Sequence, residues 1–475
     1  MHRFLISAAH KSSGKTTISI GLAAALKARG HSVQPFKKGP DYIDPLWLGL
    51  ASGQPCRNLD FYLSPHEELK AQFARHGHAA DVCLVEGNKG LYDGLDLEGS
   101  NSNAALARLL GLPVILVLDA RGMTRGIAPL ILGYQAFDRE LHIAGVILNR
   151  LGGSRHEAKL RAVIEHYTDV PVIGALLEDT RLRLTERHLG LMPVNETASA
   201  ANRVAEIAEL VAAQVDLTRL LDLTMTESPL PQPLPARARD AGAGLAPLRI
   251  AIARDAAFGF YYADDLDAFA AAGVELVPFD TLSDPHLPEA DGLFIGGGFP
   301  ESFLPALEAN SSLRSEIRAA IDAGMPAYAE CGGLMYLARS IAWQGQTRQM
   351  VGVIEADVVM HDKPVGRGYV KLLPDAAHPW LRQFAAGKED AAALAAHEFH
   401  YSSLANLSPQ TRFAYRMQRG HGSDGEHDGI IFRNLLASYT HLRSTPACEW
   451  AAQFAEFVRR ARTQAMAPRC NGSRR

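Results

Sequence analysis

One stretch near the N-terminus limits the folds open to this chain more than any other. The apolar run Phe4-Leu5-Ile6 leads into Ala8-Ala9-His10-Lys11-Ser12-Ser13-Gly14-Lys15-Thr16-Thr17, and a helical apolar pattern continues to Leu26. A strand, a tight loop with Gly-Lys-Thr and a helix are together the context of a phosphate-binding loop. Backbone N–H groups of such a loop and of the helix N-terminus surround phosphate oxygens. The predicted nucleotide-binding residues are Gly14, Lys15, Thr16 and Thr17.

Two side chains of this loop have separate expected roles. Lys15 can reach the terminal phosphates of a nucleotide, and the Thr16 hydroxyl can hold Mg²⁺. The loop departs from the usual pattern at its first position, where Ala9 replaces glycine. A helix that begins with Gly-Lys-Thr and binds nothing is the alternative, but the flanking strand and helix favour the nucleotide site.

Apolar runs of strand length alternate with amphipathic helical stretches through the first half of the chain. The runs include Val82–Val85, Val114–Leu118, Ala144–Leu148 and Val170–Leu177, and the helical stretches include Glu67–Arg75, Ala104–Leu110 and His156–Tyr167. This alternation predicts an α/β fold, a doubly wound and mostly parallel sheet with helices on both faces. Ligands of such sheets bind at the carboxyl ends of the strands.

Polar side chains follow several of these runs. Asp41 and Asp44 lie three residues apart in Lys37–Pro45, whose two prolines and one glycine restrict the backbone. A solvated turn would explain the charges but not the rigid frame. Glu86 ends the run Val82–Val85, and a carboxylate on a buried strand needs a partner such as a metal or a substrate.

Asn149 follows Ala144–Leu148. Its amide could contact a nucleotide base edge, although asparagine also commonly ends strands. We include it among the predicted nucleotide-binding residues.

Composition and charge exclude several classes of protein. The 475 residues are 47% hydrophobic and 21% charged, which is typical of globular domains, and they are too many for one core. The net charge of −4 gives no electrostatic case for a nucleic-acid or membrane partner. The apolar run Leu112–Leu118 is too short to cross a bilayer, and the N-terminal run is too short for a signal peptide. Five scattered cysteines form no disulfide framework, so we expect a cytoplasmic protein.

A proline-rich segment divides the chain. We predict a nucleotide-binding domain over residues 1–223, an exposed linker over 224–247, a second alternating α/β domain over 248–462 and a disordered tail over 463–475. Strand-like runs of the second domain are Leu248–Ala253, Val274–Pro278, Leu293–Ile295 and Pro326–Glu330. The last of these leads into Cys331-Gly332-Gly333, with a helix expected to continue to Ile341.

Cys331 lies where a nucleophile would be exposed, at a strand-to-helix elbow followed by glycine. A helix N-terminus lowers the pKa of a thiol, and nearby backbone N–H groups, including those of Gly296-Gly297-Gly298, could bind an oxyanion. A cysteine nucleophile also needs a base, and spacing does not choose among His397, His400 and His441. A buried, inert cysteine is the alternative. We interpret the other four cysteines as structural or incidental thiols: Cys56, Cys83, Cys448 and Cys470.

Taken together, these motifs resemble the cobyrinate a,c-diamide synthase family, glutamine-dependent amidases of corrin and related tetrapyrrole rings. The resemblance extends from Phe4 to about Arg459. It is carried, in order, by Ser12–Thr17, Lys38–Pro45, Arg57–Asp60, Glu86-Gly87, Gly90–Gly94, Gly145–Arg150, Glu186–Gly190, Phe294–Glu301, Cys331–Met335 and His397–Ser402.

The resemblance implies a fold, a reaction and roles for single residues. The first domain would be similar to dethiobiotin synthetase, a phosphate-loop fold, and the second to class I glutamine amidotransferases. Cys331 would be the glutaminase nucleophile, His441 its base, and the N–H groups of Gly297 and Gly332 the oxyanion donors. The synthetase site would use Asp41, Asp44 and Glu86, with Mg²⁺ on Thr16, Asp41 and Glu86.

The implied activity is that of a carbon–nitrogen ligase. Acetate carboxylates a and c of cobyrinate would be amidated through an acyl phosphate made from ATP, with ammonia from glutamine. We therefore expect L-glutamine and a tetrapyrrole polycarboxylate as substrates. A homodimer is among the assemblies that the sequence leaves open.

Two departures bear on the site and on the ring. Class I amidotransferases place a glutamate two residues after the base, where this chain has Arg443, which predicts a Cys–His dyad without a third member. Asn88-Lys89 and Ser100–Asn103 are more similar to relatives that amidate sirohaem or sirohydrochlorin, so that ring is the alternative substrate. We expect both segments to contact the ring carboxylates.

A switch ATPase that moves cargo is the alternative from another class. Its signature lysine would stand five residues before Lys15, where this chain has His10. Such a protein would also have no use for the Cys331 elbow.

Overall fold

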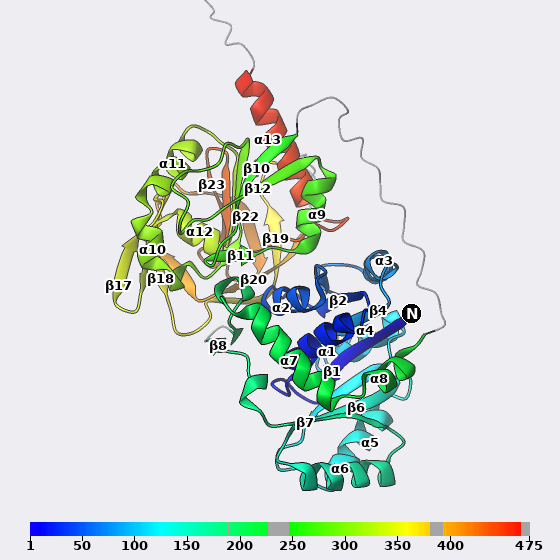
Figure 1. Ribbon diagram of the computed structural model, residues 1–475. Helices are drawn as coiled ribbons and strands as arrows, with labels where there is room; N and C mark the ends of the chain where they lie inside the picture. Colours follow the sequence, from blue (N-terminus) through cyan, green and yellow to red (C-terminus); the bar gives the residue numbers. More distant parts are fainter. Residues whose placement is uncertain (188–189, 227–246, 381–392, 467–475) are drawn as a thin grey trace, which may run out of the picture. The chain divides into compact units, whose positions relative to one another are not determined.

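The computed structural model describes residues 1–187, 190–226, 247–380 and 393–466, which form two compact units, Met1–Ala236 and Arg237–Arg475 (Figure 1). Most of the predicted linker, 227–246, lies outside the described residues. Before it, Met225 pairs with His2, and Thr226 N–H donates to Met1 O. Within the described residues, no helix is both long and apolar enough to cross a membrane.

The first unit is built on a parallel seven-stranded sheet with the order β3-β2-β4-β1-β5-β6-β7. Its strands are β1 (His2–Ala8), β2 (Val33–Lys38), β3 (Arg57–Leu59), β4 (Val82–Glu86), β5 (Val114–Asp119), β6 (Ile143–Leu151) and β7 (Val172–Leu177). Its helices are α1 (Lys15–Ala28), α2 (Ile43–Ser52), α3 (His66–Gly77), α4 (Asn103–Leu110), α5 (Ile127–Phe137), α6 (Ser154–Tyr167), α7 (Ala200–Gln214) and α8 (Leu217–Thr224).

Helices cover both faces of this sheet, as predicted. Alternate side chains of a strand point to opposite faces, so Phe4 and Ile6 of β1 pack with α1, α2, α7 and α8, whereas Leu5 packs with α3 to α6. Strand β1 lies between β4 and β5. The loop between β1 and α1 is therefore central at the carboxyl edge, with the ends of β2 and β4 on one side and of β5 and β6 on the other.

The second unit has a nine-stranded sheet with the order β12-β10-β13-β15-β24-β23-β22-β19-β20. Neighbours from β12 to β24 are parallel, and neighbours from β24 to β20 are antiparallel. The strands are β10 (Leu248–Ala253), β12 (Val274–Phe279), β13 (Gly292–Ile295), β15 (Ala327–Glu330), β19 (Gly366–Pro374), β20 (Leu394–His400), β22 (Arg412–Arg419), β23 (His427–Phe432) and β24 (Leu435–Ser438). The helices are α9 (Ala263–Ala271), α10 (Leu304–Ala309), α11 (Ser311–Asp322), α12 (Gly332–Leu337) and α13 (Trp450–Met466).

Two smaller sheets complete the second unit. Strand β11 (Phe258–Phe260) pairs with β14 (Gly297–Gly298). The other small sheet contains β17 (Gln346–Gln349), β16 (Ala338–Trp343), β18 (Ile354–Met360) and β21 (Ser402–Ala405).

Two expectations fail at helix ends. The helix after Cys331 stops at Leu337 instead of reaching Ile341, because residues 338–343 form β16 and pair with β17 and β18. Residues 463–466 of the predicted disordered tail are helical, because the amphipathic pattern of α13 continues through them. The remainder of that tail, 467–475, lies outside the described residues, and so does Cys470.

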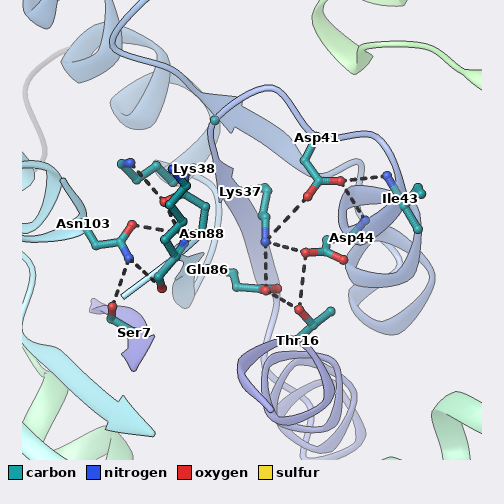
Figure 2. Close-up of polar contacts among 12 residues, drawn as sticks. Ser7, Thr16, Lys37, Lys38, Asp41, Ile43, Asp44, Glu86, Asn88 and Asn103 are labelled. Atoms are coloured by element: carbon teal, nitrogen blue, oxygen red, sulfur yellow. Dashed lines mark hydrogen bonds and ion pairs between the residues drawn. The ribbon is translucent and has the colours of Figure 1, made fainter. Parts of the chain in front are cut away.

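Asn103 fixes the loop that follows β4. Its fully buried amide donates to Ser7 Oγ at 3.1 Å and Gly90 O at 3.0 Å, and its Oδ1 accepts from Asn88 N–H at 3.2 Å (Figure 2). An Asn103→Ala change leaves buried backbone groups unpaired, so we expect a loss of about 1–3 kcal/mol from the free energy of unfolding. Urea unfolding measures that loss, and hydrogen exchange should rise over residues 87–91.

Ser102→Ala is the matched control for this prediction. It removes the cap bond from Ala105 N–H to Ser102 Oγ at the start of the same helix, which costs about 1 kcal/mol without releasing the loop. Equal exchange of residues 87–91 in the two variants would contradict the role assigned to Asn103.

Candidate functional sites

The loop between β1 and α1 has the backbone of a phosphate-binding loop. Gly14, the residue before α1, has φ +91°, and Ser12 has φ +64°. Asn149 at the end of β6 donates its amide to Ser13 O at 2.9 Å. A Cβ on Gly14 would lie 2.2 Å from Asn149 Nδ2, so only glycine fits there. Asn149 therefore supports the loop, and its contact with a nucleotide base stays a prediction.

Lys15 is buried with no hydrogen-bond or ion-pair partner among the described residues and is 7% exposed. Burial and the charge of Lys37 lower the pKa of Lys15 to about 8, despite the carboxylates of Glu86, Asp44 and Asp93. A buried ammonium without a counter-ion is costly. An incoming phosphate would remove that cost, as expected for a nucleotide site.

Lys37, at the end of β2, forms ion pairs with all three predicted carboxylates. Its Nζ lies 2.5 Å from Asp44 Oδ2, 2.9 Å from Glu86 Oε1 and 3.8 Å from Asp41 Oδ2 (Figure 2). Burial alone would lower the pKa of Lys37, but these three charges raise it well above its usual value. Lys37 was not among the predicted site residues, although a lysine near the end of a buried strand indicates an ion pair as clearly as Glu86 does.

Thr16 and Glu86 provide oxygen ligands suited to a divalent cation. Thr16 Oγ1 donates to Glu86 Oε1 at 2.6 Å and lies 3.3 Å from Asp44 Oδ2. Glu86 Oε2 is buried and accepts no hydrogen bond from a described residue. Burial raises the pKa of Glu86, with Lys37 opposing the rise. Hydroxyl and carboxylate oxygens fit Mg²⁺, and Asp44 rather than Asp41 is the carboxylate beside Thr16.

Asp41 has a different environment from Asp44. Its Oδ1 accepts N–H groups of Ile43 and Asp44 at 2.9 and 3.2 Å, at the start of α2. Burial and the charge of Asp44 raise the pKa of Asp41 to about 7, although Lys37 lowers it. Asp41 can therefore exchange a proton near neutral pH.

The two segments expected to contact a ring, Asn88-Lys89 and Ser100–Asn103, differ in how many of their polar groups are already used inside the fold. Asn103 is fully buried and holds the loop after β4, Asn101 Oδ1 accepts from Leu95 N–H at 2.8 Å, and Ser102 caps α4. The expectation that Asn103 contacts the ring is therefore wrong, because its amide is used inside the fold. Asn88 is half-buried, and Lys89 is exposed.

Cys331 forms the predicted elbow between β15 and α12. Its backbone has φ +48° and ψ −102°, a strained conformation for a residue with a side chain. A Cβ on Gly332 would lie 2.9 Å from Gly298 O, and one on Gly333 would lie 2.2 Å from Ile295 O. The elbow thus packs directly on the glycine turn after β13, which places the two predicted oxyanion segments against each other.

His441 is the histidine that the fold brings to Cys331. Cys331 is among the groups that raise the pKa of its imidazole, and a Cβ on Gly297 would lie 2.8 Å from His441 Cε1. Burial lowers the pKa of His441, but hydrogen bonds to Cys331 and Glu330, with their charges, raise it to about 10. The site therefore favours an imidazolium beside Cys331.

The other two candidate bases have different surroundings. The His397 ring stacks on His441 with centroids 4.9 Å apart, and burial, with the charges of His441 and Arg443, lowers the pKa of His397 well below its usual value. His400 stacks on Tyr439 at 4.0 Å, and its Nδ1 donates to Ser402 O at 2.8 Å. His397 thus packs on the predicted base, whereas His400 contacts Tyr439 and Ser402.

Glu330, the residue before Cys331, was not among the predicted site residues. Its Oε2 lies 3.3 Å from His441 Nδ1, and its Oε1 accepts from Tyr328 OH at 2.7 Å and from Leu442 N–H at 3.0 Å. The expected dyad thus has a carboxylate at its histidine. The only sequence signal was a glutamate ending a buried strand, which is also the signal given by Glu86.

Arg443 occupies the position where class I amidotransferases have the glutamate that orients the histidine, a contact that Glu330 makes in this chain. Its guanidinium pairs with Asp264 Oδ2 at 2.6 Å and lies over the Tyr262 ring at 5.4 Å. The position two residues after the histidine therefore holds a cation that is paired with α9.

Comparison with known proteins finds relatives over nearly the whole chain. Residues 5–191 match the family described as CobQ/CobB/MinD/ParA nucleotide binding domain, and residues 249–446 match the CobB/CobQ-like glutamine amidotransferase domain. A cobyrinate a,c-diamide synthase of Magnetococcus marinus is 46% identical, covering 96% of this chain and 97% of that protein. Proteins of the same name from Methanosarcina acetivorans and Listeria monocytogenes are 41% and 39% identical, covering 96% and 93% of this chain and 95% and 96% of theirs.

The contact between Glu330 and His441 predicts an effect on thiol reactivity. Glu330→Gln removes the charge that holds the proton on the imidazole, so the pKa of His441 falls and the imidazolium that activates Cys331 is less populated. A hydrogen bond to a charged group is worth about 1.5–3 kcal/mol. We expect Cys331 alkylation by iodoacetamide at pH 7 to slow roughly tenfold to a hundredfold, with its rise shifted to higher pH.

Glu398→Gln is the matched control for this experiment. Glu398 is equally buried, but its carboxylate accepts N–H groups of His421 and Gly422 and lies 3.7 Å from the Nε2 atom of a different histidine, His400. Its variant should keep the original alkylation profile against pH. A Glu330→Gln profile that coincides with that of the unmodified protein would show that Glu330 does not control the pair.

Proposed function

The chain belongs to the cobyrinate a,c-diamide synthase family, and from this we propose that it is an ATP- and glutamine-dependent ligase that amidates acetate carboxylates a and c of cobyrinate. One observation supports the proposal: this chain has both of the sites that such a ligase needs. The first unit has a phosphate loop beside a carboxylate cluster, and the second unit has a cysteine elbow with its histidine. The curated relatives favour cobyrinate over a sirohaem-type ring. We also propose a cytoplasmic location, and the homodimer stays a prediction.

The second unit releases ammonia from glutamine. The Cys331 thiolate attacks the carboxamide carbon, and backbone N–H groups of Gly297 and Gly332 stabilise the oxyanion. The C–N bond breaks as the His441 imidazolium gives its proton to the leaving nitrogen, which leaves ammonia and a γ-glutamyl thioester. Water then attacks the thioester with His441 as base, and glutamate departs. Glu330 holds the imidazole in place through Nδ1.

The first unit activates the carboxylate. A ring acetate oxygen attacks the γ-phosphorus of ATP, and an acyl phosphate and ADP form. Lys15 neutralises the transferring phosphoryl group. Mg²⁺, when bound by Thr16 and Glu86 with Asp44 beside them, would add positive charge at the phosphates. Ammonia attacks the acyl carbon, phosphate leaves, and Asp41 accepts the proton that the new amide nitrogen loses.

The switch ATPase remains the alternative function, because the matched nucleotide-binding family also includes MinD and ParA. The Cys331–His441 pair favours the amidating enzyme, since a switch ATPase has no use for a nucleophilic thiol. Glutamate release by the purified protein distinguishes the two functions.

Cys331→Ala should separate the two half-reactions. We expect glutamate release to fall roughly a thousandfold or more, because the nucleophile is lost. Synthesis from added ammonium salts should persist, since acyl phosphate forms in the other unit. Cys448→Ala, which removes another buried thiol of the same unit, should leave both activities unchanged. Full glutaminase activity in Cys331→Ala would refute the assignment.

Lys15→Ala should have the converse effect. Synthesis from either nitrogen donor should fall roughly 10²- to 10³-fold, because acyl phosphate formation precedes both reactions, while glutaminase activity is kept. Lys27→Ala, an exposed lysine of the same helix, is the control. A defect confined to the glutamine-dependent reaction would contradict the role of Lys15.

A further inference from the structure

Two consecutive lysines end β2, and their side chains have different surroundings. Successive side chains of a strand point to opposite faces, so Lys37 faces α1 and its carboxylates, whereas Lys38 faces the loop after β4 (Figure 2). Lys38 Nζ donates to Asn88 Oδ1 at 3.2 Å. That neutral oxygen is the only acceptor it has within the described residues, although the side chain is 5% exposed.

This arrangement leaves hydrogen-bonding capacity unused. An ammonium carries three donors, and a buried one without a counter-ion is unfavourable. Burial, with the charges of Lys89 and Lys37, lowers the pKa of Lys38 to about 8, and Asp60 offsets only part of the effect. Lys15 is also buried, and its pKa is also lowered to about 8. The phosphate loop explains what Lys15 binds, but nothing in the nucleotide site explains Lys38.

Asn88 is oriented so that it adds a second donor. Its N–H donates to Asn103 Oδ1, and its own Oδ1 accepts from Lys38 Nζ and from Lys89 N–H at 3.0 Å. With the oxygen turned toward these donors, Nδ2 has no acceptor among the described residues. An ammonium with unused donors and an amide NH2 group without an acceptor are together complementary to an anion.

The position of this pair indicates which anion. Strands β2 and β4 are neighbours, with Lys37 opposite Glu86, so Lys38 and Asn88 lie at the carboxyl edge beside the cluster that activates the carboxylate. They are on the face opposite Thr16, away from the proposed phosphate ligands. A ring whose acetate is phosphorylated beside this cluster carries further carboxylates around its edge.

We propose that Lys38 and Asn88 form a binding subsite for a peripheral carboxylate of the tetrapyrrole, different from the acetate that is phosphorylated. The inference rests on the proposed function and assigns a specificity-determining site to it. A ring without a carboxylate at that place would leave both donors unpaired, and the subsite would discriminate against it.

Lys38→Met tests the subsite, because methionine has a similar length and no charge. We expect the KM for cobyrinate and its equilibrium dissociation constant to rise roughly tenfold to a hundredfold. The KM for ATP and the glutaminase rate should not change. Lys159→Met, the same substitution at an exposed position of α6, should alter none of these values. Unchanged cobyrinate affinity in Lys38→Met would overturn the proposal, and so would a rise confined to the KM for ATP, which would identify the anion as phosphate.

Asn88→Asp provides a second test if Lys38→Met folds poorly. The new carboxylate lies beside Lys38 and takes the place of the ring carboxylate, so cobyrinate affinity should fall to a similar extent. Equal affinity in Asn88→Asp and the unmodified protein would overturn the proposal.

Equilibrium dialysis of the ring without ATP measures this affinity independently of turnover. If the unmodified protein binds cobyrinate but does not amidate it, the proposed function fails while the subsite is still tested. If amidation proceeds and both variants bind normally, only the subsite fails.

Discussion

Both candidate sites depend on one constraint: an ionised group buried at the carboxyl end of a parallel strand must have a partner. In the first unit Lys37 takes its partners from Glu86, Asp44 and Asp41. In the second unit Glu330 is paired with His441. Each pair joins side chains from different strands or loops, so the burial of charge also fixes the distances between reacting groups.

Buried charges without a counter-ion indicate where a ligand of opposite charge binds. The charge of the paired Lys37 acts on both Lys15 and Lys38, and each has a pKa lowered to about 8. Paired charges such as Lys37 organise the empty site, whereas unpaired ones mark where anionic groups bind. The same distinction applies to Glu86, whose one oxygen meets Lys37 and Thr16 while the other lacks a described partner.

Sequence patterns predicted the parts that depend on local chemistry. Strands β4, β5 and β10, the loop at Gly14 and the elbow at Cys331 were all visible as apolar runs followed by glycine or charge. Glu330 was not, because its role depends on His441, which lies far away in sequence and just after β24, the strand that pairs with β15. The helix end at Leu337 was missed because an apolar run fits either helix or strand until its pairing partner is known.

The central claim is that the phosphate loop and the cysteine elbow serve a single amidation. The most direct measurement follows, in one reaction with cobyrinate, ATP and glutamine, the amounts of ADP, glutamate and amide formed. The account predicts equal amounts of all three for each amide added, and two amides on the final product. Glutamate and ADP released without any amidated ring would contradict it.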